Sequence, residues 1–177
     1  FDTAVVLPSG SLLKPHVEAL GFPVFEVDAM ADKSLDSKAV RKLLGVFRSF
    51  KPDIVHTHAS MAARIAARLF GAKVVFTRHS VFPPSPRLTH GLGKLVCGAA
   101  NNLTADKIIA VAEAAKQNVT DTGACEKKIE VVLNGVEPLR AYSETELAAL
   151  KKKFGVPDGY YSAAIVARLN EVKGHKY

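Results

Sequence analysis

Short apolar runs rich in β-branched residues alternate along the chain with longer segments of helical periodicity. The apolar runs predict strands at residues 3–7, 23–27, 53–57, 73–77, 107–111, 129–133 and 161–167. Amphipathic spacing predicts helices at about residues 11–21, 35–50, 60–70, 88–100, 112–122 and 144–154. Most of these strands lack an apolar–polar alternation, which is typical of strands that helices bury on both faces. The regular exchange of strand and helix predicts an α/β fold with a doubly wound parallel sheet.

One break in the pattern divides the chain. A turn-forming cluster and a helix with a capping-box sequence separate the strand at 129–133 from the strand at 161–167. Residues 1–7 already resemble an interior strand, so we expect the first domain to lack an earlier βα unit and the fold to be incomplete. The predicted organisation is an N-terminal domain, a linker with a helix, and the first strand and turn of a second domain, at residues 1–136, 137–158 and 159–177.

The composition favours a globular protein. The chain has 177 residues, of which 48% are apolar, and no apolar run approaches the roughly 20 residues of a membrane-spanning helix. Cys97 and Cys125 are too few for a disulfide framework, and we interpret them as reduced thiols. These features indicate a cytoplasmic protein. The chain begins without Met, which is compatible with an upstream leader.

The charge is unevenly distributed. The net charge is +7, and residues 38–94 contain eleven Lys and Arg residues but a single acid, Asp53. Such a stretch attracts nucleic acid, an anionic membrane surface or phosphorylated small molecules. For Arg64 and Arg68, which lie four residues apart on a predicted helix, a solvated helix face is the simpler interpretation.

Two histidines lie at the end of the strand predicted at 53–57. Residues 53–60 read D-I-V-H-T-H-A-S, and His56 and His58 point to the same side of a strand because side chains alternate. One interpretation is a pair of metal ligands. The other is a structural hydrogen bond from one ring and a loop hydrogen bond from the other. Ser60 belongs to the same loop or, alternatively, caps the next helix.

Two further strands end in polar loops. The strand at 73–77 continues directly into Arg78 and His79, and a histidine there could donate to a phosphate or a sugar hydroxyl. Asn134 and Gly135 follow the strand at 129–133. Gly135 could supply a positive φ for a tight turn beside a ligand, or form an ordinary inter-domain turn.

The last predicted strand delivers two cations. Residues 163–175 read A-A-I-V-A-R-L-N-E-V-K-G-H, so Arg168 follows the strand and Lys173 lies on the turn beyond it. The carboxyl ends of parallel strands are where open α/β sheets bind ligands. Arg168 could bind phosphate oxygens bidentately, while Lys173 would supply a compact point charge.

Taken in order, these stretches resemble the retaining GT-B glycosyltransferases, specifically glycosyltransferase family 4. The matching stretches are V-L-P-S-G-S-L, D-I-V-H-T-H, V-F-T-R-H, D-K-I-I-A-V, V-L-N-G-V-E and A-R-L-N-E-V-K-G, at residues 6–12, 53–58, 75–79, 106–111, 132–137 and 167–174. Two positions differ from the family pattern, since Ala112 replaces a serine and Glu137 replaces an aspartate.

The resemblance implies the Rossmann-like N-terminal half of a GT-B enzyme, with the acceptor on this domain and the nucleotide-sugar donor on the next. It implies that Arg168 and Lys173 bind the donor diphosphate and that His79 is the catalytic residue. It assigns to the acceptor side of the cleft His58, Ser60, Arg78, Asn134 and Gly135. No metal ion and no cofactor are expected apart from the donor substrate.

The predicted function is transfer of a sugar from a nucleotide-diphosphate sugar to a sugar, lipid-linked or phosphorylated acceptor with retention of configuration. We expect a role in cell-envelope, glycolipid or polysaccharide biosynthesis, at the inner face of the cell membrane and in peripheral contact with anionic lipid. The family's glycine-rich loop and its E-x7-E motif lie outside the chain, so the chain alone is expected to be inactive.

Two alternatives remain open from the sequence. One is a non-catalytic α/β module that binds anions or nucleic acid through the basic stretch. No nucleic-acid motif is present and few aromatic residues interleave with the cations, so a nucleic-acid partner is not expected. The other is a GT-B nucleotide-sugar epimerase or phosphorylase, which shares the architecture.

Overall fold

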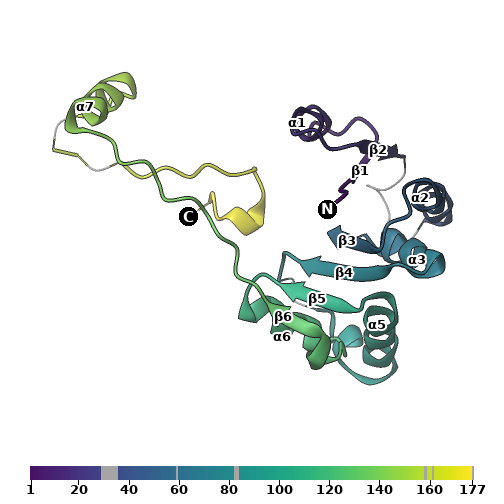
Figure 1. Ribbon diagram of the computed structural model, residues 1–177. Coiled ribbons are helices and arrows are strands. Elements are labelled where there is room, and N and C mark those ends of the chain that lie inside the picture. Colours follow the sequence, from purple (N-terminus) through teal and green to yellow (C-terminus); the bar gives the residue numbers. More distant parts are fainter. Residues whose placement is uncertain (29–35, 59, 82–83, 158, 161, 177) are drawn as a thin grey trace. The chain divides into compact units, whose positions relative to one another are not determined.

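A computed structural model of the protein describes residues 1–28, 36–58, 60–81, 84–157, 159–160 and 162–176. The chain divides into two compact units, residues 1–135 and residues 136–177, which are described separately (Figure 1). No helix in the described part of the chain is both long and apolar enough to cross a membrane.

The first unit alternates strands and helices. Its strands are β1 (Val5–Pro8), β2 (Val24–Val27), β3 (Ile54–His58), β4 (Lys73–Arg78), β5 (Lys107–Ala110) and β6 (Ile129–Val131). Its α-helices are α1 (Lys14–Ala19), α2 (Ser37–Phe50), α3 (Met61–Phe70), α4 (Pro86–Thr89), α5 (Gly91–Thr104) and α6 (Glu113–Asp121). All six strands that the sequence predicts in this unit are found, with ends shifted by two residues or fewer.

The helix predicted at 88–100 forms instead as α4 and α5. His90 has an extended backbone (φ −133°, ψ 155°) and Gly91 has a positive φ of 54°, so helical geometry stops between Thr89 and Leu92. The pattern of apolar residues continues across the break, and for that reason the sequence predicts a single helix.

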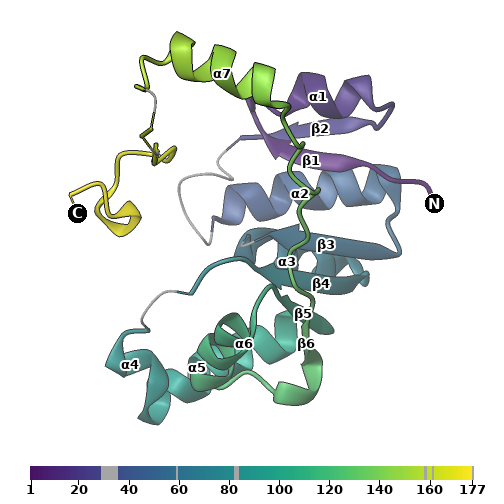
Figure 2. The same cartoon turned by 90° about the vertical axis from the view of Figure 1, so that its left-hand side faces the viewer.

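The strands form two parallel sheets. β1 pairs with β2, and the other four strands are hydrogen-bonded in the order β3-β4-β5-β6. α2 lies between the two sheets (Figure 2), and its Leu43 and Phe47 share one core with Val27 of β2 and Val74 of β4. The parallel, Rossmann-like α/β fold predicted from the sequence is therefore confirmed.

The two faces of the four-stranded sheet differ. On one face, Phe76, Ile108 and Ile129 are buried in a core with residues of α6. On the other, Ile54 is 63% exposed and the neighbouring apolar side chains are only half-buried. In the described residues, the prediction that helices bury both faces is therefore wrong for this sheet. The strands are apolar on both sides, but packing covers only one.

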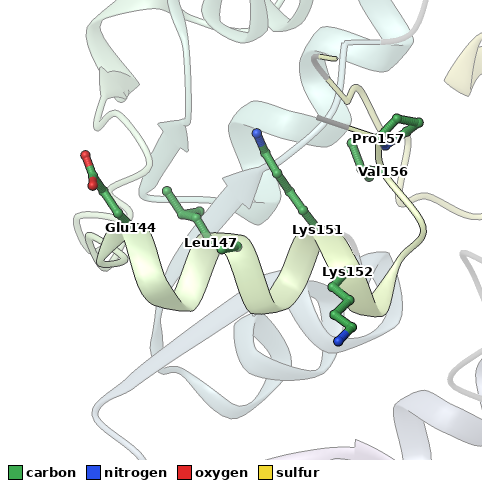
Figure 3. Close-up of a pocket in the computed structure, with 7 residues that line it drawn as sticks. Glu144, Leu147, Lys151, Lys152, Val156 and Pro157 are labelled. Atoms are coloured by element: carbon green, nitrogen blue, oxygen red, sulfur yellow. The ribbon is translucent and has the colours of Figure 1, made fainter. Parts of the chain in front are cut away.

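The second unit contains one α-helix, α7 (Glu144–Lys153), among its described residues. The predicted capping box is present: the Ser143 side chain accepts from the Glu146 backbone, and the Glu146 side chain accepts from the Ser143 backbone. A hollow of about 620 Å³ lies along α7 and is lined by Glu144, Leu147, Ala148, Lys151, Lys152, Val156 and Pro157 (Figure 3). It contains none of the residues for which the sequence predicts chemistry.

The strand predicted at 161–167 is absent in its described part, residues 162–167, which are irregular. A strand needs a neighbour to share its backbone hydrogen bonds, and the sheets of the described chain consist of β1 to β6 only. The assignment of residues 159–177 to a second domain stays a prediction.

Candidate functional site

Three histidines gather at the carboxyl ends of β3 and β4. The parallel register places His58 of β3 opposite Thr77 of β4, so His79 comes next to His58. His58 Nδ1 and His79 Nε2 are 2.7 Å apart, with their rings stacked at a centroid distance of 5.0 Å. The His56 ring lies 4.6 Å from that of His58, and His56 Nε2 is 2.7 Å from the Thr77 hydroxyl oxygen. Two motifs that are 21 residues apart thus form one cluster.

Two rings of the cluster, His56 and His58, favour the neutral form. Burial, and then repulsion from His79, lowers the pKa of His58 below its usual value. Burial also lowers the pKa of His56, with smaller contributions from His58 and His79. A neutral imidazole has one donor and one acceptor nitrogen. One ring of the His58–His79 pair donates and the other accepts, which leaves His58 Nε2 and His79 Nδ1 for other partners.

These contacts match the second of the two interpretations of His56 and His58. His56 bonds to a hydroxyl of the neighbouring strand and His58 bonds to a loop histidine. Within the described residues, no group of three His, Cys, Asp or Glu side chains could hold a metal ion. The chemistry open to this cluster is hydrogen bonding to hydroxyls and, after protonation, to anions.

Ser60 and Arg78 make contacts within the fold. The Ser60 hydroxyl accepts from the Ala63 backbone at 3.2 Å, so Ser60 is the N-cap of α3, as the alternative interpretation predicts. Arg78 is half-buried at the end of β4 and donates to Asn118 Oδ1 at 2.9 Å. Because Asn118 lies on α6, Arg78 points to the helix-covered side of the sheet, away from His56 and His58.

Asn134 and Gly135 are exposed on the irregular segment after β6. Gly135 is not among the glycines with positive φ, and a Cβ added there would meet nothing within 4 Å. Of the two interpretations of Gly135, the positive-φ turn is therefore wrong, since neither the backbone nor a close neighbour requires glycine.

Arg168 and Lys173 share one small loop in the second unit. Lys173 belongs to a 3₁₀ helix, Glu171–Lys173, and its backbone donates to the Asn170 carbonyl at 3.0 Å. The His175 ring donates through Nε2 to the Arg168 carbonyl at 3.0 Å, which closes the loop. Both cationic side chains are exposed. The loop can therefore present two positive charges to an anion.

One buried cation, Arg64, was not predicted from the sequence. Arg64 is only 3% exposed, and its guanidinium lies 4.4 Å above the Phe76 ring and donates to Asn101 Oδ1 at 3.1 Å. Burial lowers its pKa from 12.5 to about 10, so it remains charged at neutral pH. The prediction that Arg64 lies on a solvated helix face is wrong. The one sequence signal for its burial was the group of alanines beside it in α3, whose small side chains leave room for a long buried side chain.

Comparisons with known proteins agree with this architecture. The family model of Glycosyltransferase Family 4 matches residues 2–140. The crystal structure of Anabaena Alr3699/HepE in complex with UDP and glucose superposes with a TM-score of 0.66 at 22% identity, over 88% of this chain and 43% of HepE. The HepE complex with UDP-glucose gives a TM-score of 0.65 at 20% identity, over 89% and 43%.

A putative UDP-N-acetylglucosamine 2-epimerase from Listeria monocytogenes reaches a TM-score of 0.49 at 19% identity, over 73% of this chain and 36% of that chain. No protein with a curated functional description matches. The chain spans less than half the length of HepE. The family model nevertheless covers most of the chain, and the fold is that of the N-terminal half of a GT-B enzyme. The chain therefore belongs to glycosyltransferase family 4.

Proposed function

We propose that this chain is part of a retaining glycosyltransferase that moves a sugar from a nucleotide-diphosphate sugar to a sugar, lipid-linked or phosphorylated acceptor. The main support is the His58–His79 pair, in which two family motifs come together at the carboxyl edge of the sheet. HepE, which shares the fold, was crystallised with UDP and with UDP-glucose. The proposal locates the reaction in the cytoplasm and in cell-envelope, glycolipid or polysaccharide synthesis.

In the proposed reaction, the bond between the donor sugar and the diphosphate breaks, and negative charge develops on the diphosphate. In this proposal, Arg168 and Lys173 present two positive charges from one small loop and stabilise that leaving group. Such contacts accelerate the reaction because they are stronger in the transition state than in the ground state. Loss of one preorganised donor of this kind typically lowers kcat by about 10²- to 10³-fold.

His79 acts on the acceptor side as a hydrogen-bonding group. Its Nε2 is engaged by His58 Nδ1, so Nδ1 is the nitrogen available to a sugar hydroxyl. Burial and the neighbouring His79 lower the pKa of His58, which disfavours a positive charge on its ring. In this proposal, the pair therefore orients a hydroxyl and leaves the diphosphate to the cations of the second unit.

The proposal is tested with the full-length protein. Purified enzyme is incubated with labelled nucleotide-diphosphate sugars and a membrane extract, and sugar transfer and free nucleoside diphosphate are measured. We expect transfer, with the anomeric configuration retained in the product by NMR. Release of an epimerised sugar without transfer would instead identify an epimerase.

Single substitutions test the proposed role of each residue. Arg168→Ala and Lys173→Ala should each lower kcat by about 10²-fold or more, and His79→Ala should lower transfer without weakening nucleotide binding. Lys127→Ala removes an exposed cation outside the site and should leave activity unchanged. Sugar transfer by the 177-residue chain alone would contradict the expectation that this chain is inactive by itself.

A further inference from the structure

We propose that His58 is a positioning residue, which accepts a hydrogen bond from His79 Nε2–H and so holds His79 as the tautomer whose Nδ1 lone pair faces the acceptor hydroxyl. His58 Nδ1 and His79 Nε2 are 2.7 Å apart. The part played by the hydroxyl rests on the proposed function. The tautomer of His79 does not depend on that function and is tested separately.

The two nitrogens that meet determine which tautomers are compatible. A neutral imidazole carries one proton, so one of its nitrogens donates and the other accepts. If His79 Nε2–H donates to His58 Nδ1, both rings carry their proton on Nε2. If His58 Nδ1–H donates instead, both rings carry it on Nδ1. The Nε2–H form is the more stable tautomer of an isolated histidine side chain, so the observed pairing favours His79 as the donor.

The arrangement of the two rings suits this bond. An imidazole N–H bond and the lone pair of the other nitrogen both lie in the plane of the ring. The planes of His58 and His79 differ by only 25°, so the N–H of one ring can point at the lone pair of the other. The bond connects the end of β3 to the loop after β4. It therefore orients His79 from a rigid element of the sheet.

His56 and Thr77 hold the His58 ring in place. The His56 ring lies 4.6 Å from that of His58, and His56 Nε2 is 2.7 Å from the Thr77 hydroxyl oxygen. Thr77 is only 5% exposed, so its hydroxyl is a fixed point of the sheet. These contacts limit rotation of the His58 ring, and His58 Nδ1 therefore stays directed at His79.

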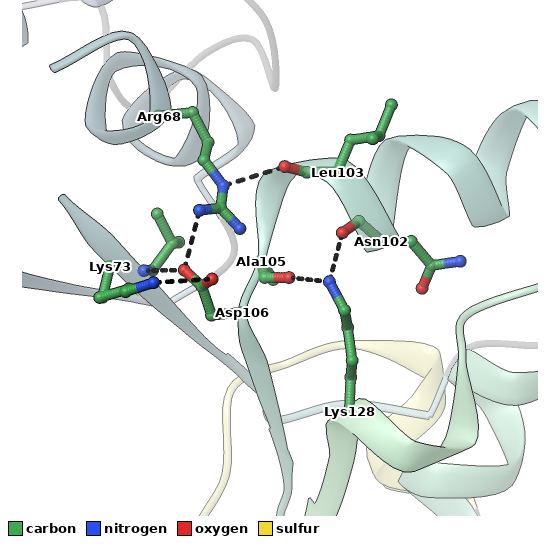
Figure 4. Close-up of polar contacts among 8 residues, drawn as sticks. Arg68, Lys73, Asn102, Leu103, Ala105, Asp106 and Lys128 are labelled. Carbon is green, nitrogen blue, oxygen red and sulfur yellow. Dashed lines mark hydrogen bonds and ion pairs between the residues drawn. The ribbon is translucent and has the colours of Figure 1, made fainter. Parts of the chain in front are cut away.

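No carboxylate in the described part of the chain takes this orienting role. The sequence has no Asp or Glu from residue 54 to residue 105. The next acid, Asp106, is ion-paired with Arg68 at 2.9 Å and lies 4.0 Å from Lys73, the first residue of β4, and so lies at the amino edge of the sheet (Figure 4). A carboxylate would stabilise a protonated imidazole. A neutral histidine orients its partner without adding negative charge to the site.

The tautomer decides what His79 offers to a substrate. With its Nε2 proton engaged by His58, His79 presents a lone pair on Nδ1, which accepts a hydrogen bond. A sugar hydroxyl can donate to that lone pair. A phosphate dianion has only acceptor oxygens and would meet the lone pair unfavourably. The group that binds at His79 is therefore a hydroxyl of the acceptor and not a phosphate.

Nitrogen NMR of the full-length protein, with ¹⁵N-labelled histidine rings, tests the tautomer in alkaline buffer. We expect a protonated nitrogen at His79 Nε2 and an unprotonated one at Nδ1. His58→Phe keeps an aromatic ring beside His56 but removes the accepting nitrogen, so both His79 signals should move toward those of an exchanging tautomer mixture. His58→Asn places an acceptor oxygen near the position of Nδ1 and should restore the wild-type signals. His16→Phe, at an exposed position of α1, is the matched control and should leave them unchanged.

Sugar transfer by the same full-length variants tests the positioning role. His58→Phe should lower kcat by about 10- to 100-fold, the range seen when the partner that orients a metal-binding histidine is removed. His58→Asn should recover most of that loss, and His16→Phe should transfer sugar like the wild type. The KM for the nucleotide sugar should stay unchanged in all three, because the proposed diphosphate ligands are Arg168 and Lys173. His58 is exposed, so circular dichroism should show an unchanged fold.

Three results would overturn the proposal: a proton on His79 Nδ1 in the wild type, unchanged His79 signals in His58→Phe, or a wild-type rate of transfer by that variant. Absence of sugar transfer by the wild type would count against the proposed function instead. In that case the nitrogen signals still decide whether His58 fixes the tautomer of His79.

Discussion

For the buried guanidinium of Arg64, the cost of burying its charge can be compared with the energy that its contacts return. Its pKa, lowered by burial from 12.5 to about 10, corresponds to a cost of about 3 kcal/mol for the charged form at ~1.36 kcal/mol per unit. The cation–π contact with Phe76 returns roughly 0.5–2 kcal/mol. A hydrogen bond from a charged donor, such as the one to Asn101, returns about 1.5–3 kcal/mol. The terms nearly cancel, so the charge itself contributes little net stability.

Arg64→Met keeps much of the side-chain volume and removes the charge. We therefore expect its free energy of unfolding to remain within about 1 kcal/mol of the wild type, or to rise. Arg64→Ala removes the charge and also leaves a cavity beside Phe76, so it should lose about 2–5 kcal/mol, as other truncations of long buried side chains do. Equilibrium urea unfolding, followed by circular dichroism, gives both values.

The test is the difference in free energy of unfolding between Arg64→Met and Arg64→Ala. If Met destabilises the protein as much as Ala does, the charge and not the packing stabilises this site, and the cancellation argued above is wrong. Lys127→Ala, at an exposed position, controls for the loss of a positive charge from the whole molecule and should change stability by less than about 0.5 kcal/mol.

Two further predictions concern the sheet edge and α5. The lowered pKa values of His56 and His58 mean that the unfolded chain binds protons more readily near pH 6.5, so stability should fall as pH drops below about 6.5 and level off below the folded pKa values. Urea unfolding from pH 8 to pH 5 should show this loss, and His56→Asn/His58→Asn should lessen it. Gly98→Ala should lower stability by about 1–3 kcal/mol, because its Cβ would meet the Gly123 backbone. Equal stability of that variant in urea would contradict the close approach.

Local sequence signals were sufficient for most of the fold. Strands of a parallel sheet are short, apolar and bounded by turn residues, so β3 and β4 are visible without tertiary information. Helix ends are equally local: the Ser143 capping box and the Ser60 cap depend on residues within one turn. For the strand predicted at 161–167, local sequence signals were not sufficient, because a strand forms only where another strand accepts its hydrogen bonds.

Tertiary surroundings decided what the sequence could not. Arg64 and Arg68 have the same spacing as any exposed basic pair on a helix, yet α5 covers Arg64 while Arg68 reaches Asp106. The sequence also did not show which face of α5 is buried. The spacing of its large apolar residues predicts one buried face, yet all four are exposed: Leu92, Leu95, Val96 and Leu103. The close approach of Gly98 to Gly123 turns the opposite face of the helix inward.

The candidate site depends on the register of one pair of strands. Read singly, each histidine motif is ambiguous, since a loop histidine has many possible partners. Parallel pairing places His58 opposite Thr77, so the chain can bring His79 Nε2 within 2.7 Å of His58 Nδ1 two residues later. A one-residue slip would turn His56 and His58 to the helix-covered face, since side chains alternate along a strand. Burial of Val55 and Val74 in the α2–α3 core opposes that slip. The apolar core thus sets the register, and the register unites the two motifs in one site.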